Sequence, residues 1–313
     1  MILPILRSLL VLAVLASLGG CGDGVLAPAG PIAAAEKTLL LDSLAIMLAI
    51  VVPTLVATLA FAWWFRAGNS RARYLPTWQY SGQLELLVWS VPALVVLFLG
   101  GIAWVASHDL DPAQPLTARA ASAGGTAAMP LTEPVAKPLE IEVVSLDWKW
   151  LFIYPKQQVA SINRLVVPTG VPLHLRLTSA TVMNVFFVPR LGSEIYTMSA
   201  MATQLNLQAD EAGIYPGLSA NFSGDGFADM RFDVQAVAAE EFGRWTVATK
   251  STGTRLDERA YRGLLHQSVN LQPYTYSAVQ PGLFDRIVSL QLPPGEGPQQ
   301  GRPSPAVRSV REH

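Results

Sequence analysis

The chain has 313 residues, of which 51% are hydrophobic and only 14% are charged, and its formal net charge is -1. A protein that neutralises phosphates needs a clustered excess of Lys and Arg, so this balance argues against nucleic-acid binding. The single cysteine, Cys21, excludes an intramolecular disulfide and any site that needs two thiolates. The apolar residues concentrate in three runs before residue 107, which predicts a membrane portion followed by a soluble domain.

Residues 1 to 20 have the layout of an export signal. One basic residue, Arg7, precedes an apolar stretch that ends in small residues directly before Cys21. The tetrad LGGC at 18 to 21 is similar to the bacterial lipobox, in which the cysteine is acylated and becomes the new N-terminus. We therefore expect removal of residues 1 to 20 and lipid attachment at Cys21. The alternative is an unmodified cysteine at the end of a signal anchor.

Two uncharged runs of 22 residues follow, at 44 to 65 and at 86 to 107. At 1.5 Å per residue, each would form a helix about 33 Å long, which is enough to cross a hydrocarbon core. Tryptophans lie near the run ends, where amphipathic rings favour the membrane interface. We predict two transmembrane helices, preceded by a segment at 21 to 43 and separated by a loop at 66 to 85.

The charges around these runs predict their orientation. Arg66, Arg71 and Arg73 lie in or beside the loop, and residues 67 to 83 contain no acid. By the positive-inside rule the loop is cytoplasmic, so the N-terminal segment and the C-terminal domain are both periplasmic. This agrees with the export signal and predicts a protein of the bacterial inner (plasma) membrane.

The rest of the chain predicts a β-domain between less ordered segments. Residues 108 to 138 are rich in Ala, Pro, Gly and Thr and are typical of a linker. Residues 238 to 292 contain helical patterns and predict a small helical appendage, and the polar tail at 293 to 313 is typical of disorder. Between them, at 139 to 237, short segments typical of strands are separated by turn residues, as in an antiparallel sandwich. These segments are 139–145, 148–154, 165–167, 172–179, 185–188, 204–210 and 230–236.

Several motifs, taken in order, resemble subunit II of the haem-copper oxidases, and in particular that of the bo-type ubiquinol oxidases. They are LELLVWSVPALVVLFL at 84 to 99, DWKWLFIYP at 147 to 155, VMNVFFVPRLGSEIY at 182 to 196 and YPGLSANFSGDGF at 215 to 227. The resemblance covers about residues 36 to 290. It implies an α+β membrane protein: a two-helix transmembrane hairpin, then a periplasmic cupredoxin-like antiparallel β-sandwich with a small C-terminal helical appendage.

The family's copper ligands are absent from the matching positions. In the cytochrome c oxidases a two-copper centre is held by a His in a V-x-H-S-F-like strand and by a C-x-x-x-C-x-x-x-H-x-x-M loop. Here Asn184 stands at the strand His, Ser219 and Ser223 replace both cysteines, Phe227 replaces the loop His, and Met230 alone remains. Hydroxyl, amide and phenyl groups cannot replace the thiolates and imidazoles that such a copper pair needs, so we expect no metal on this chain.

The four histidines, His108, His174, His266 and His313, are expected to be structural or solvated. The resemblance implies that haem and copper lie in subunit I, where oxygen is reduced to water and protons are pumped. A domain without copper cannot take electrons from cytochrome c by that route, so quinol dissolved in the membrane becomes the expected donor. The predicted function is a non-redox subunit of a proton-pumping ubiquinol oxidase. Its partners would be subunit I, other oxidase subunits and membrane lipid, with ubiquinol met only indirectly.

One residue has a functional role by resemblance. Glu85, directly before the second apolar run, corresponds to the family glutamate that admits protons to a channel of subunit I; the alternative is an ordinary interfacial acid near Arg71 or Arg73. Trp148 and Trp150 occupy the segment that relays electrons in copper-bearing relatives, and without copper they are interpreted as packing aromatics. Asp147 and Glu194 could seal an outer exit region above subunit I, but surface solvation is the more frequent outcome.

Two other functions have to be weighed. A cytochrome c oxidase subunit II with a copper pair is disfavoured by the missing ligands. A stand-alone membrane lipoprotein unrelated to respiration would predict no haem protein as partner.

Overall fold

The structure is a computed structural model, and it describes residues 24–73, 75–116 and 137–298. The expected export signal, Cys21, most of the expected linker, the tail beyond residue 298 and His313 lie outside these ranges. The described chain forms two compact units. One comprises residues 24 to 34 together with 112 onward, and the other is Ala35–Asp111.

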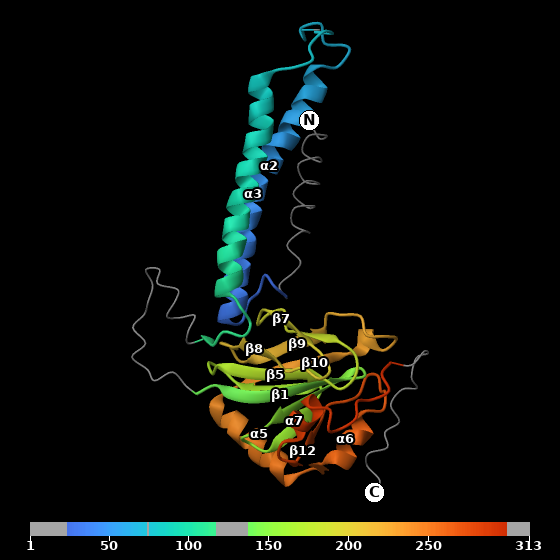
Figure 1. Ribbon diagram of the computed structural model, residues 1–313. Coiled ribbons are helices and arrows are strands. Elements are labelled where there is room, and N and C mark those ends of the chain that lie inside the picture. The colour runs from blue at the N-terminus through green and yellow to red at the C-terminus, as the bar shows by residue number, and fades with distance from the viewer. Residues whose placement is uncertain (1–23, 74, 117–136, 299–313) are drawn as a thin grey trace, which may run out of the picture. The chain divides into compact units, whose positions relative to one another are not determined.

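The second unit is a hairpin of two long apolar helices (Figure 1). Helix α2 spans Pro31–Trp64 and helix α3 spans Gly82–Asp109. Proline suits the first position of a helix because the N–H that it lacks would have no helical partner there. The helices, with 34 and 28 residues, are roughly 51 and 42 Å long. The prediction of two apolar helices is confirmed, and both extend beyond the uncharged runs.

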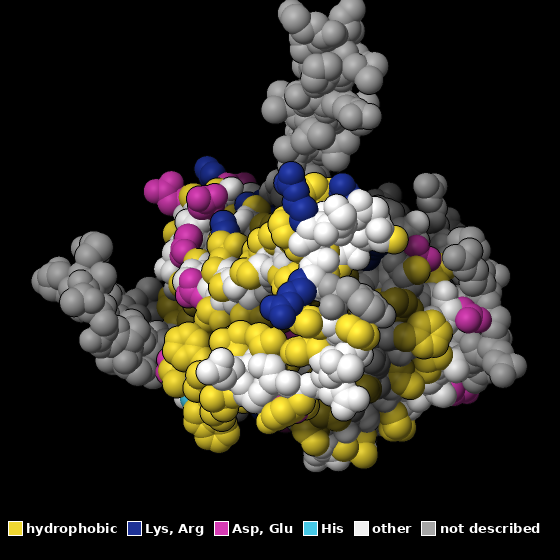
Figure 2. Space-filling model, turned by 90° about the horizontal axis from the view of Figure 1, so that it is seen from above, with side chains coloured by type: hydrophobic (Ala, Val, Ile, Leu, Met, Phe, Trp, Pro, Cys, Tyr) yellow, Lys and Arg dark blue, Asp and Glu magenta, His cyan; other side chains and the backbone are white. Residues whose placement is uncertain are grey.

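Large apolar side chains are exposed along both helices. Leu59 and Trp89 are 70% and 73% exposed, for example, and both helices are long and apolar enough to cross a membrane. Figure 2 shows apolar side chains over much of the face that is seen from above. An exposed apolar surface of this extent is unfavourable in water and fits a lipid or protein environment.

The β-domain, residues 139–237, is a sandwich of two sheets (Figure 1). Sheet A has the strand order β12-β3-β2-β1-β5-β8, and sheet B has the order β4-β10-β9-β6-β7. In chain order the strands of the β-domain are β1 Leu139–Leu146, β2 Lys149–Tyr154, β3 Val159–Ile162, β4 Arg164–Pro168, β5 Leu173–Ser179, β6 Asn184–Phe187, β7 Glu194–Thr197, β8 Thr203–Leu207, β9 Gly213–Ser219 and β10 Arg231–Val237, with a 3₁₀ turn η1 at Phe227–Asp229.

The sandwich is confirmed, but its strands are not all antiparallel as expected. Strand β1 pairs with β5 in parallel, and β10 pairs with β4 in parallel. A parallel pair requires a crossover connection, and here β2, β3 and β4 intervene between β1 and β5. Turn residues between neighbouring strands indicate where the chain reverses, but they carry no information about which distant strand it meets.

The sequence patterns also missed strands β3, β7 and β9. Strand β9 contains Pro216 and two glycines, which normally argue against a central strand. Gly217 has a packing reason, because a Cβ there would lie 2.2 Å from the ring of Phe232. The glycine therefore makes room for a core aromatic of the paired strand β10.

The core between the sheets is built around three aromatic rings. Trp150 and Phe186 are fully buried, and Phe232 is 3% exposed. Phe186 stacks on Phe232 at a centroid distance of 4.9 Å, and Trp150 meets the edge of Phe186 at 5.5 Å. These rings come from β2, β6 and β10, so they join the two sheets.

The C-terminal region, residues 239–292, packs on the outer face of sheet A (Figure 1). Leu151 and Ile153 of β2 form a second core there with Tyr261, Phe284 and other apolar residues. The region is not purely helical as expected, because it adds a strand to sheet A and a two-stranded sheet, β11 with β13. Its elements are α5 Ala239–Ser251, β11 Arg255–Leu256, α6 Glu258–Leu264, β12 Tyr274–Tyr276, β13 Ala278–Val279 and α7 Leu283–Val288.

Removal of a ring from the inner core should be costly. Phe186→Ala is expected to lower the free energy of unfolding by about 3–5 kcal/mol, because the cavity is walled by rigid rings. The matched control is Phe222→Ala, since Phe222 is 73% exposed and its loss should cost about 0.5 kcal/mol or less. Denaturant unfolding of the full chain in detergent, followed by tryptophan fluorescence, measures both. Equal losses for the two variants would contradict this account of the core.

Candidate functional site

The structure brings together, at one end of sheet B, three of the five positions at which the family pattern places copper ligands. Asn184 begins β6, Ser219 ends β9, and Met230 directly precedes β10; all three are buried. The hydroxyl of Ser219 donates to Oδ1 of Asn184 at 3.2 Å, and the Ser219 amide donates to the Met230 carbonyl at 3.2 Å. An amide and a hydroxyl therefore bond to each other where the family pattern places metal ligands.

The other two positions lie in the loop between β9 and β10. Ser223 is 7% exposed, and its carbonyl accepts a hydrogen bond of 3.0 Å from the indole nitrogen of Trp148. Phe227 begins the turn η1, and its ring meets the exposed ring of Phe222 edge-on at 5.7 Å. A Cβ at Gly226 would lie 2.2 Å from the Trp148 ring, so the glycine lets the loop close over that indole.

This set of donors does not fit a copper pair. It offers an amide, two hydroxyls, a phenyl ring and one thioether, whereas the centre requires bridging thiolates and imidazoles. Within the described residues, no group of three or more His, Cys, Asp or Glu side chains could hold a metal ion. Ser219 and Asn184 bond to each other, whereas the buried hydroxyl of Ser223 has no hydrogen-bond partner among the described residues.

The three described histidines have local roles. Nδ1 of His174 bonds Oδ1 of Asn206 at 2.9 Å, and Nδ1 of His108 lies 2.9 Å from the Trp104 carbonyl one helical turn earlier. The backbone carbonyl of His266 accepts a hydrogen bond from Lys149. The ring contacts agree with structural roles for His174 and His108, and the exposed position of His266 agrees with solvation.

The aromatic pair before and within β2 packs as expected. Trp148 is 1% exposed and Trp150 is fully buried. Trp148 has a positive φ of 63°, an uncommon conformation for a bulky residue, which marks the tight turn between β1 and β2. Both indoles are thus part of the packing.

Asp147 departs from the sequence expectation. Surface solvation was expected for Asp147 and Glu194, and Glu194 is indeed exposed, but Asp147 is only 3% exposed. The hydroxyl of Thr181 donates to Oδ1 of Asp147, and no described residue bonds its Oδ2. Burial raises the pKa of the Asp147 carboxyl, an effect that the Thr181 hydrogen bond partly offsets. The C-terminal region buries this turn, and nothing in the local sequence around Asp147 shows that cover.

Lys149 is a buried cation that sequence reasoning did not identify. Its ammonium donates to the His266 carbonyl at 2.6 Å and to the Ser268 hydroxyl at 2.7 Å. Burial lowers the pKa of Lys149 to about 8, and the nearby Asp147 charge opposes that shift. Both hydrogen bonds reach the C-terminal region, so Lys149 ties that region to β2. The sequence feature that could have indicated a buried lysine is its place between two tryptophans in the motif DWKW.

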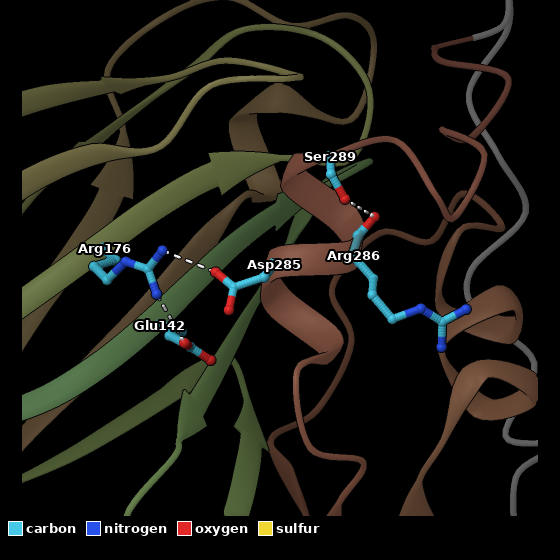
Figure 3. A network of polar contacts seen from close by, with 5 residues as sticks. All are labelled: Glu142, Arg176, Asp285, Arg286 and Ser289. Carbon is cyan, nitrogen blue, oxygen red and sulfur yellow. Dashed lines mark hydrogen bonds and ion pairs between the residues drawn. The ribbon is translucent and has the colours of Figure 1, made fainter.

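A second polar network joins the outer face of sheet A to α7. The guanidinium of Arg176 on β5 reaches Glu142 of β1 at 3.3 Å and Asp285 of α7 at 2.9 Å (Figure 3). The same guanidinium lies 4.9 Å from the ring centroid of Phe284. Burial raises the pKa of Glu142 to about 7 against the opposing charge of Arg176, and Asp285 and Glu140 add to the increase. In Figure 3 the Arg286 side chain extends away from this network, and it pairs with Glu258 instead.

Glu85 lies in the first turn of α3, and its side chain is exposed. Its amide donates to the Ser81 carbonyl at 3.0 Å, so the helix is formed at this residue. A carboxylate in the first turn interacts favourably with the positive end of the helix dipole. Among the described residues, Glu85 makes no ion pair with Arg71 or Arg73.

Comparison with known proteins decides the family. Residues 140–237 match the family described as the periplasmic domain of cytochrome c oxidase subunit II, and residues 250–295 match the cytochrome oxidase aromatic-rich motif. The chain is 46% identical to the ubiquinol oxidase subunit 2 of Acetobacter aceti over 272 residues, covering 87% of this chain and 84% of that one. It is 41% identical to the cytochrome bo(3) ubiquinol oxidase subunit 2 of Pseudomonas aeruginosa, covering 87% and 77% of the two chains. The Pseudomonas putida protein of that name is 39% identical, with coverage of 97% and 88%.

The chain belongs to the ubiquinol oxidase subunit 2 family. The resemblance seen in the sequence motifs is thereby confirmed. The two matched regions of the chain correspond to the β-domain and to most of the C-terminal region that packs on it. The contacts from Lys149 and Arg176 therefore join the two matched regions within one unit.

The Glu142 carboxyl gives the stability of the chain a testable pH dependence. Because the pKa of Glu142 is about 7 in the fold and 4.5 ordinarily, the folded state holds its proton more tightly. The stability that this tighter proton binding gives to the fold is fully present below pH 4.5 and is lost as the pH rises through 7. Gln does not ionise, so Glu142→Gln should not show this loss. From pH 5 to pH 8, the difference in the free energy of unfolding between Glu142→Gln and wild type should shift in favour of the variant by roughly 2 kcal/mol, after allowance for solvent screening.

The control is Glu240→Gln on α5. Glu240 is exposed and is not among the residues that shift the pKa of Glu142, so this change should leave the difference in stability between pH 5 and pH 8 as it is in wild type. Denaturant unfolding of both variants and of wild type at pH 5 and pH 8 gives the comparison. A pH-independent difference between Glu142→Gln and wild type would show that Glu142 titrates normally.

Proposed function

We propose that this chain is the non-redox subunit 2 of a proton-pumping ubiquinol oxidase, which couples quinol oxidation to the reduction of oxygen to water. The catalytic centre, with haem and copper, would lie in subunit I. The observation that carries the proposal is the set of oxygen and hydrocarbon groups at Asn184, Ser219, Ser223 and Phe227. They stand in a chain that belongs to the ubiquinol oxidase subunit 2 family.

The chemistry of these groups determines the proposed electron donor. A two-copper centre can receive an electron from a soluble haem protein because soft ligands stabilise both of its oxidation states. Asn184 and Ser219 bond to each other and offer no thiolate or imidazole. Electrons must then reach subunit I by another route, and a quinol dissolved in the membrane reaches it directly.

The proposed location is the bacterial inner membrane, with α2 and α3 as spans. The loop with Arg71 and Arg73 would be cytoplasmic, and the N-terminus and the β-domain would be periplasmic. Cys21 would carry the lipid after removal of residues 1 to 20. Lipid would thus be one partner of the chain, beside subunit I and the other oxidase subunits, with ubiquinol met only through the complex.

We assign proton uptake on the cytoplasmic side to Glu85. Its side chain is exposed in the first turn of α3, next to the apolar run that would enter the membrane. A carboxylate at such a boundary can exchange protons with water and pass them to a partner channel when the partner partly desolvates it. An interfacial acid paired with Arg71 or Arg73 is the competing role.

Substitution of Glu85 tests this assignment. Glu85→Ala in the purified oxidase complex should slow quinol oxidase turnover severalfold, because the proton acceptor at the channel mouth is lost. Glu240→Ala, an exposed acid of α5 in the other unit, is the control and should leave turnover unchanged. Oxygen uptake at several pH values is the measurement. Unchanged turnover of Glu85→Ala across that range would reject the role and leave the subunit assignment intact.

The oxidase assignment itself is tested by isolation from the native membrane. A pulldown of the tagged chain in mild detergent should bring down a haem protein visible in the absorption spectrum, with oxygen uptake driven by ubiquinol. Absence of haem would favour a stand-alone lipoprotein. Copper in stoichiometric amount on the separated subunit, with rapid oxidation of reduced cytochrome c, would favour a copper-bearing subunit II.

A further inference from the structure

Strand β8 is the outer strand of sheet A on the side away from β12. An edge strand presents backbone groups that no neighbouring strand satisfies, and proteins cover such edges with other segments. Here β8 and the residues after it bind two separate pieces of chain. One piece precedes the apolar unit Ala35–Asp111, and the other directly follows it.

The preceding piece is held through Ala29. The Ala29 amide donates to the Arg190 carbonyl at 2.8 Å, and the Ala29 carbonyl accepts from the Asp210 amide at 2.9 Å. Both backbone groups of one residue are thus satisfied by two different loops of the β-domain. Nε of Arg190 also donates to the Ala27 carbonyl at 2.8 Å, while its guanidinium lies 5.1 Å from the ring centroid of Tyr215.

The fit of this piece is close. A Cβ at Gly30 would lie 2.1 Å from the Gln208 carbonyl oxygen, so only glycine allows the two backbones to approach. Ala29, Ile32 and Ala33 are 3%, 2% and 0% exposed, and Ala29 and Ile32 belong to the inner core cluster. The first turn of α2 is therefore part of the β-domain unit.

The following piece is held through Pro112. Its carbonyl accepts two hydrogen bonds from one residue of β8, from the amide and from Nδ2 of Asn206, each at 3.0 Å. Nδ1 of His174 bonds Oδ1 of the same side chain at 2.9 Å, which fixes the amide orientation so that Nδ2 faces Pro112. Leu116 then packs against the inner core cluster.

We propose that the β8 edge is a two-point mount, which clamps the chain where it enters the apolar hairpin and again where it leaves it. Ala27–Ala33 form the first clamp, and Pro112 with Asn206 forms the second. Because each clamp uses paired backbone groups and buried side chains, neither connection acts as a free tether. The mount limits the swing of the β-domain on the hairpin, and it does not depend on the oxidase role of the chain.

Two isosteric or near-isosteric changes open the clamps separately. Gly30→Ala places a methyl group against the Gln208 carbonyl, and Asn206→Asp replaces a donor to Pro112 with an acceptor. Gly243→Ala, where nothing lies within 4 Å, and Asn270→Asp, at an exposed position, are the matched controls. Arg190→Met loses the donor to Ala27 and the contact with the Tyr215 ring but keeps the backbone carbonyl that accepts from Ala29, and it covers the case in which Gly30→Ala does not fold.

Hydrogen exchange of the full chain in lipid nanodiscs reads each clamp. Gly30→Ala should increase the exchange rates of the Ala29 and Asp210 amides by about tenfold or more. Asn206→Asp should increase the exchange rate of the amide of residue 206 by a similar factor. Arg190→Met should have a smaller effect on the first pair. The controls should match wild type. Wild-type protection of Ala29 and Asp210 in both Gly30→Ala and Arg190→Met would overturn the first clamp.

Distance measurement tests the mount as a whole. Spin labels on genetically encoded amino acids at Ser70 and Val247, both exposed, report the separation of the hairpin loop and the β-domain unit. The full chain in nanodiscs should give a narrow distribution that broadens at least twofold in Gly30→Ala with Asn206→Asp, and less in either single variant. An unchanged width in the double variant, or a wild-type distribution already as broad, would overturn the proposal.

Discussion

The burial of sheet A on both faces is the constraint on which the rest of the β-domain depends. Its inner face packs with sheet B around Trp150, Phe186 and Phe232, and its outer face packs with Tyr261 and Phe284 of the C-terminal region. Every residue of β2 is buried for this reason. A strand covered on both sides becomes a near-continuous apolar run, so any charge within it needs partners from the covering elements.

Those partners explain the polar groups in the packing. Lys149 uses the carbonyl of His266 and the hydroxyl of Ser268, and Arg176 uses Asp285. In each case an ion of the β-domain finds its partner in the C-terminal region. Because a buried charge without a partner is costly, the contacts of Lys149 make the two regions dependent on each other. The Arg176–Asp285 pair lies nearer the surface, with side chains 38% and 64% exposed, and contributes less.

The loop between β9 and β10 carries two of the positions at which the family pattern places copper ligands, Ser223 and Phe227. The hydroxyl of Ser219 bonds Asn184, and the indole of Trp148 bonds the carbonyl of Ser223. Hydrogen bonds and aromatic packing thus hold the loop that metal ligation would otherwise hold.

The sequence by itself determined the two apolar helices, the β-sandwich, and which side chains stand at the motif positions 184, 219, 223 and 227. These features are local: an apolar run, strand segments bounded by turns, and a motif with fixed spacing. Only the tertiary structure decided the parallel pairing of β1 with β5, the burial of Asp147 and the capture of Ala29 and Pro112 by the β8 edge. The physical reason is that strand pairing, burial and buried hydrogen bonds depend on segments that are distant in the sequence, such as Ala27 and Arg190, which are 163 residues apart. The local pattern around a residue carries no record of such partners.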